Sequence, residues 1–138
     1  MIALWQDREV LDRLEAKARV VRATCVRMAH EGRESHLNGA LSCADILVAL
    51  HGHWLRAGLR GDKDPDRDVL LFSKGHACAA LYATLALEGD IPLEWLDRYA
   101  RDESPLPSHP CIHALPLLEC SSGSLGHGLG IGTGRAYA

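Results

Sequence analysis

The 138-residue sequence contains no run of lysine or arginine residues and no long uninterrupted apolar segment. With a net charge of −3, it offers no basic surface for nucleic acid. Its apolar runs are short and broken by charged residues, so no membrane span is predicted. The first ten residues, MIALWQDREV, contain acids where a signal peptide needs an apolar core. We therefore do not expect secretion.

Cysteine is present, but the cysteines form no recognisable disulfide pattern. The five cysteines are odd in number and include no Cys-x-x-Cys pair. Both features favour reduced thiols and a cytoplasmic protein. The cysteines are Cys25, Cys43, Cys78, Cys111 and Cys120.

Phosphate-binding glycine motifs are also missing, although glycine is concentrated in the segment SSGSLGHGLGIGTG. Here every second residue from Gly126 to Gly134 is glycine. The dinucleotide fingerprint needs glycines at relative positions 0, 2 and 5, and no frame of this segment supplies them. No Gly-Lys-Ser/Thr follows, which excludes a P-loop. Another role must explain these glycines.

The length and the apolar content of 47% predict one domain with a substantial core. Helical periodicity predicts a first helix from Asp7 to His30, which Gly32 ends. Its recurring apolar positions are Leu11, Leu14, Ala18, Val21 and Cys25.

Further helices are expected along the chain. After a loop over residues 32–40, a second helix is predicted from Ser42 to Leu55, with Ser42 as its N-cap and Asp45 in a variant capping box. Residues 56–68 are polar and predict a surface loop. Another helix is predicted over residues 74–89 and a short one after Pro92. Residues 102–116 contain four prolines and are expected to be irregular.

One segment predicts a β-strand. In DVLLFS, residues 68–73, four apolar residues stand between an aspartate and a serine, as in a buried parallel strand. A single buried strand needs neighbours on both sides. The predicted fold is therefore α/β and mostly helical in this chain, with the sheet completed by another chain.

Histidine is frequent, with eight residues in this length. Four of them, His36, His76, His109 and His127, stand in or beside segments rich in glycine, serine or proline. Loops of this kind often carry functional groups, and imidazole can both give and take a proton near neutral pH.

Two other uses of these side chains stay open. The set of His109, Cys111 and His113 could bind zinc in an adaptor protein, although Cys-x-His spacing alone is a weak signal. A Cys–His nucleophilic pair could form from Cys78 with His76, or from Cys111 with His109. The sequence near these pairs shows no third residue that would orient the histidine, as a catalytic triad needs. We therefore expect Cys78 to pack within its helix.

Four ordered segments resemble the N-terminal part of transketolases. They are HLNGALSCADILVAL, DPDRDVLLFSKGHACAALYATLALEGDIP, LPSHP and ECSSGSLGHGLGIGTGRA. The resemblance covers nearly the whole chain. It implies the N-terminal portion of a thiamine-diphosphate-binding fold, with residues 1–138 as part of the diphosphate-binding domain.

The resemblance also implies roles for particular residues. His76 would contact the cofactor near its diphosphate, and Gly123, Ser124 and Leu125 would form the turn against the cofactor. His36 and His109 would face the sugar substrate and assist proton transfer. The following glycines would begin a closely packed helix.

In that helix, Gly126, Gly130 and Gly134 share one face at i, i+4 spacing and would let another backbone approach.

The family's Gly-Asp-Gly metal motif and its pyrimidine-binding domain are not found in these residues. We therefore expect the ligands of Mg²⁺ to come from a partner chain, with this chain as one subunit of a split enzyme. That enzyme would transfer a two-carbon ketol unit from a ketose to an aldehyde. The alternatives are a truncated relative, or a non-catalytic module that assembles with or regulates a full enzyme. Departures from the family pattern, such as Asn38 and Ser108, would alter the substrate channel.

Overall fold

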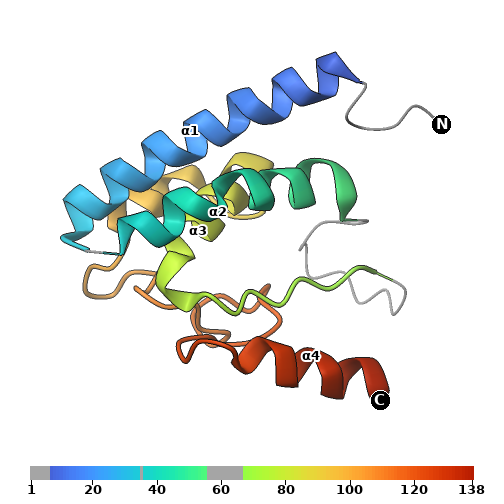
Figure 1. Ribbon diagram of the computed structural model, residues 1–138. Helices are drawn as coiled ribbons and strands as arrows, with labels where there is room; N and C mark the ends of the chain where they lie inside the picture. The colour runs from blue at the N-terminus through green and yellow to red at the C-terminus, as the bar shows by residue number, and fades with distance from the viewer. Residues whose placement is uncertain (1–6, 35, 56–66) are drawn as a thin grey trace.

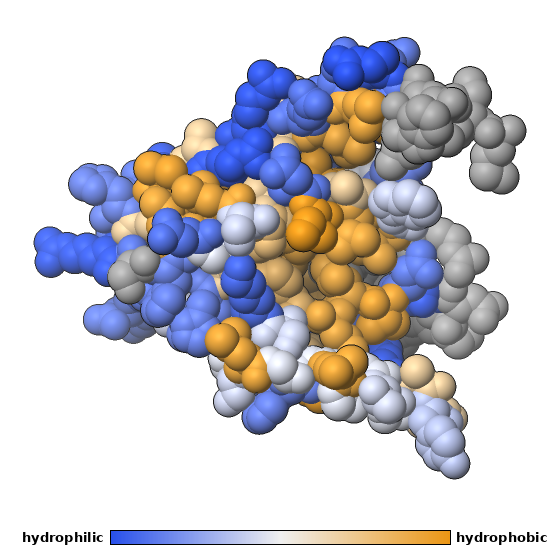
Figure 2. All heavy atoms as spheres, in the orientation of Figure 1, coloured by the Kyte–Doolittle hydropathy of each residue, from blue (hydrophilic) through white to orange (hydrophobic). Residues whose placement is uncertain are grey.

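The computed structural model describes residues 7–34, 36–55 and 67–138, so most of the predicted surface loop, residues 56–66, lies outside it. The helices α1, α2 and α3 all pack against one another, with α3 behind α2 in the view of Figure 1. An extended segment runs below α2, and helix α4 lies at the far edge (Figure 1). The middle of the face shown in Figure 2, between α2 and α4, is largely apolar.

Helix α1 spans Arg8–Gly32, close to the predicted range. Asp7 is its N-cap, and the Asp7 carboxylate accepts a hydrogen bond from the Val10 N–H at 3.2 Å. The helix ends at Gly32, as expected, and Arg33 follows in the left-handed conformation with φ 54°. The buried stripe of α1 consists of Leu14, Ala18, Val21, Cys25 and Met28.

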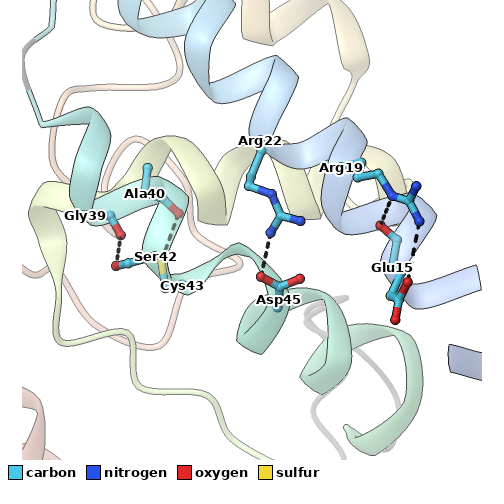
Figure 3. Close-up of polar contacts among 8 residues, drawn as sticks. All are labelled: Glu15, Arg19, Arg22, Gly39, Ala40, Ser42, Cys43 and Asp45. Atoms are coloured by element: carbon cyan, nitrogen blue, oxygen red, sulfur yellow. Dashed lines mark hydrogen bonds and ion pairs between the residues drawn. The ribbon is translucent and has the colours of Figure 1, made fainter. Parts of the chain in front are cut away.

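Helix α2 spans Leu37–Ala49 and continues as a π-helical turn over Leu50–Trp54. The expected start at Ser42 is wrong, because Ser42 lies inside the helix, where its hydroxyl donates to the Gly39 carbonyl at 2.9 Å. The expected capping role of Asp45 is wrong as well. Its carboxylate points to α1 and pairs with the Arg22 guanidinium at 2.5 Å (Figure 3).

Helix α3 spans Cys78–Glu88, directly after a 3-10 turn over Gly75–Ala77, and this agrees with the predicted range. Every residue from Cys78 to Ala86 is buried, so α3 is apolar on all sides and forms the centre of the core. Gly89 ends the helix at φ 82°, a conformation that glycine adopts without strain. The short helix expected after Pro92 is a 3-10 helix over Leu93–Arg98.

The predicted buried strand is not found. Residues 69–73 are extended, but no strand occurs among the residues that the structure describes. Leu70, Leu71 and Phe72 are only half-buried, and Val69 is 37% exposed. The apolar run encodes an extended segment, yet a strand also needs a hydrogen-bonded neighbour, and residues 7–34, 36–55 and 67–138 supply none.

Helix α4 spans His127–Tyr137, and Gly126 precedes it at φ 89°. The expected glycine face is the wrong one. A Cβ at Gly126, Gly130 or Gly134 would meet nothing within 4 Å. The close approach is made by Gly128, where a Cβ would lie 2.5 Å from the Ser73 Cβ.

The segment between the 3-10 helix and α4 is irregular, as its prolines predict. Glu119 connects this segment to two other parts of the chain. Its buried carboxylate pairs with Arg67, which precedes the extended segment, and with Arg135 of α4 at 2.6 Å. None of the helices in the described part of the chain combines the length and hydropathy that a membrane crossing needs.

Candidate functional site

Three histidines from three different segments meet in the structure. His36 is the N-cap of α2, His76 lies in the 3-10 turn before α3, and His109 belongs to the irregular segment. The ring centroids of His36 and His76 are 4.6 Å apart, and those of His76 and His109 are 4.8 Å apart. Both contacts are edge-to-face. Residues far apart in the sequence therefore form one continuous row of imidazoles with His76 at its centre.

The loop that carries His109 is held from below by the start of α3. The buried Tyr82 hydroxyl donates to the Pro107 carbonyl at 3.1 Å. The Cys78 thiol lies 3.0 Å from the Ser108 carbonyl and 3.4 Å from the Tyr99 hydroxyl. These contacts fix the two residues directly before His109. The sequence pattern indicated packing for Cys78 but did not indicate this anchoring of the loop.

The turn before α4 lies against the same row. A Cβ on Gly75 would be 2.6 Å from the Ser122 carbonyl oxygen, so only glycine lets the turn come this close. A Cβ on Gly123 would be 3.8 Å from the His109 ring. Ser124 and Leu125 follow on the surface and are exposed. The predicted cofactor turn and the three predicted histidines therefore lie together, which is the arrangement a shared site needs.

A cleft of about 390 Å³ opens beside His36 and His76. Its walls differ in character, because Leu125 supplies an apolar side chain and the remaining side chains are polar or basic. No acidic residue of the described ranges lines it. The lining residues are His36, Asn38, Gly39, Lys74, His76 and Leu125.

Two of these lining residues had no assigned role in the sequence analysis. Asn38 was noted only as a departure from the family pattern, and Lys74 only as part of the second of the four segments that resemble transketolases. A lysine two residues before a histidine, with a glycine between them, was the available signal for Lys74. His127, which also stood out in the sequence, is exposed at the start of α4 and does not line the cleft.

Buried polar atoms without a partner mark the centre of this region. His76 Nδ1 and Ser122 Oγ are both buried, and neither has a hydrogen-bond partner among the described residues. A buried polar atom without a partner is costly unless a ligand or water satisfies it. Of the two residues, His76 also lines the cleft, so its unpartnered nitrogen fits a polar ligand such as the diphosphate of the expected cofactor.

The structure does not support a zinc site at His109, Cys111 and His113 or a nucleophilic Cys78. Among the described residues, no group of three or more His, Cys, Asp or Glu residues could hold a metal ion, so His109, Cys111 and His113 form no zinc site. Burial raises the pKa of the Cys78 thiol to about 11. Cys78 is therefore protonated at neutral pH, which does not suit a nucleophile.

Comparison with known proteins agrees with the resemblance to transketolases. A family model described as "Transketolase, thiamine diphosphate binding domain" matches residues 13–138. A relative from Actinobacillus succinogenes, named as one of the subunits of apulose-4-phosphate transketolase, is 38% identical over 128 residues, which cover 92% of this chain and 46% of the relative. A relative from Clostridium sp., named 6-deoxy-6-sulfo-D-fructose transketolase subunit SqwG, is 35% identical over 91% of this chain and 46% of its own.

Solved structures agree with the sequence comparisons. The transketolase from Leishmania mexicana superimposes with a TM-score of 0.76 at 26% identity, over 84% of this chain and 18% of that one. The expected fold, the N-terminal portion of a thiamine-diphosphate-binding domain, is thereby confirmed, apart from the strand. The chain spans about half the length of the curated relatives it matches.

Proposed function

Because this chain belongs to the transketolase family, we propose that it is one subunit of a thiamine-diphosphate-dependent enzyme that transfers a two-carbon ketol unit from a ketose to an aldehyde. The observation that carries this proposal is the row of His36, His76 and His109 beside a cleft and a close glycine turn. Residues 1–138 would be part of its diphosphate-binding domain.

In this proposal, His76 and the turn of Gly123, Ser124 and Leu125 hold the diphosphate end of the cofactor. The unpartnered His76 Nδ1 and the nearby Ser122 Oγ support this role, since both can hydrogen-bond to phosphate oxygens or to the waters around them. When bound, thiamine diphosphate supplies the carbanion chemistry of ketol transfer. Mg²⁺ would accompany the diphosphate, with its protein ligands outside residues 1–138.

His36 and His109 serve the substrate. His36 is exposed at the N-cap of α2, and its side chain makes no capping hydrogen bond, so its ring is available to a ligand. His109 is half-buried and packed against His76, which restricts its orientation. Both rings can hydrogen-bond to sugar hydroxyls and move a proton when the ketose is cleaved.

The partners follow from the relatives. Those from Actinobacillus succinogenes and Clostridium are named as transketolase subunits, which supports one or more partner chains here. We assign to the partner the Gly-Asp-Gly metal motif and the pyrimidine-binding domain. The same names support small sugars or sugar phosphates as substrates. All five cysteines are free, which suits the reducing cytoplasm.

Calorimetric titration with thiamine diphosphate and Mg²⁺ tests the proposal. The titration is made with the chain alone and with the chain co-purified with its partner. We expect binding in the co-purified sample and its loss in His76→Ala. The matched control is His113→Ala, since His113 is exposed and outside the cleft. Absence of binding in both samples would refute the cofactor role and favour a non-catalytic module.

A further inference from the structure

Lys74 lines the cleft beside His36 and His76, called here the histidine cleft. It is the N-cap of the 3-10 turn that carries His76, and its Nζ extends to the first turns of α2. There the ammonium donates to the Ser42 hydroxyl at 3.0 Å and to the Gly39 carbonyl at 3.3 Å. These two contacts orient the side chain, so its charge has a defined position on the cleft wall.

The charge of Lys74 is not neutralised by the described part of the chain. Both of its acceptors are uncharged oxygens, and an ammonium has three N–H donors. Several other cations on this molecule pair with carboxylates, as Lys17 does with Glu88 at 2.7 Å and Arg22 with Asp45. Lys74 therefore keeps one N–H donor and its positive charge available to a ligand.

The surroundings of this charge favour an anion. His36 and His76 line the same cleft, and no described acidic side chain does. Asn38 adds an amide that can donate a hydrogen bond. A cation flanked by further donors, without a competing carboxylate, matches the oxygens of a phosphate-class group.

We propose that Lys74 is the anion-recognition residue of the histidine cleft and binds a phosphate or sulfonate group of the ligand held there. This rests on the proposed function in so far as the cleft is the ligand site. The anionic group has two possible sources, the diphosphate of the cofactor or a charged substituent of the sugar. Both share the same chemistry, and the experiment separates them.

The experiment uses the co-purified complex and compares Lys74→Met with Lys74→Arg. Methionine keeps the length and removes the charge, whereas arginine keeps the charge. The matched control is Arg101→Met, which removes an exposed positive charge away from the cleft. The probes are pyrophosphate without added metal, thiamine diphosphate with Mg²⁺, and ribose 5-phosphate against ribose. Circular dichroism checks that each variant is folded.

We expect Lys74→Met to weaken pyrophosphate binding by about 10- to 100-fold, the factor expected for one hydrogen bond to a charged group. Lys74→Arg and Arg101→Met should retain binding close to that of the unchanged protein. The affinity of the unchanged protein should also fall with added salt. Equal pyrophosphate affinity in Lys74→Met and the unchanged protein, or no binding by either, would overturn the proposal.

The remaining probes identify the source of the anion. If Lys74→Met weakens thiamine diphosphate but leaves ribose 5-phosphate unaffected, the anion is that of the cofactor. If it removes the preference for ribose 5-phosphate over ribose, the anion belongs to the substrate. A Lys74-dependent pyrophosphate site in a complex that does not bind thiamine diphosphate would support the anion site and refute the proposed cofactor role.

Discussion

Replacing Gly128 by alanine is expected to disturb the contact between α4 and the extended segment over residues 69–73. The added Cβ would lie 2.5 Å from the Ser73 Cβ and 2.8 Å from its Oγ. Rotation of the serine side chain cannot move its Cβ, so the helix or the segment must shift. The shift would also strain the hydrogen bond from the Gly128 N–H to the Ser73 Oγ, which is 2.9 Å long.

The matched variant is Gly130→Ala, because a Cβ at Gly130 would meet nothing within 4 Å. Alanine stabilises a helix interior by about 1 kcal/mol relative to glycine. Gly128 lies in the first turn of α4, so Gly128→Ala gains no more than Gly130→Ala from this effect. Overpacking costs about 1–3 kcal/mol, and only Gly128→Ala incurs it. Gly128→Ala should therefore be less stable than Gly130→Ala by about 1–3 kcal/mol.

Thermal unfolding of the two variants measures this difference. Gly130→Ala should raise Tm by about 3–4 °C for a domain of this size, and Gly128→Ala should melt well below it. Amide hydrogen exchange over residues 127–137 shows whether the change is local to α4. Equal increases in Tm and in exchange protection for both variants would refute the close packing of Gly128 on Ser73.

Three further predictions concern other parts of the structure. Tyr82→Phe removes the hydroxyl that donates to the Pro107 carbonyl. It should lower the free energy of unfolding, measured by urea denaturation, by about 1 kcal/mol and should also reduce turnover. Hydrogen bonds from backbone N–H groups lower the pKa of the Cys111 thiol, whereas burial raises the pKa of the Cys25 thiol to about 12. Iodoacetamide should therefore modify Cys111 well before Cys25, as followed by mass spectrometry. Burial lowers the pKa of His51 below 6.5, so the unfolded chain binds the proton more readily and stability should fall as pH drops below about 6.5. His51→Gln should reduce that loss, and an unchanged pH dependence of Tm would contradict this role for His51.

The helices of the core could be predicted well because their signals are local. The apolar spacing along α1 determined its buried stripe, and Asp7 and Gly32 determined its ends. Gly89 and Gly126 likewise marked the end of α3 and the start of α4, since both positions have positive φ. Short-range sterics and capping decide these features, and both can be read from neighbouring residues.

The start of α2 could not be predicted in the same way. Gly39 is a poor helix former and Ser42 is a good N-cap, so the local signals favoured a later start. In the structure, Ser42 donates back to Gly39, and Lys74 binds both residues from another segment. Tertiary contacts therefore decided where this helix begins.

By itself, the sequence determined which residue types stand at the candidate site and the order in which they come. The four motifs identified His36, His76, His109 and the Gly123 turn, and the glycine spacing determined which positions of α4 share a face. Only the tertiary structure decided that Gly128 faces inward, that Cys78 and Tyr82 hold the His109 loop, and that Lys74 lines the cleft. The physical reason is that a helical repeat defines faces without choosing between them. The choice depends on packing between segments that are distant in the chain.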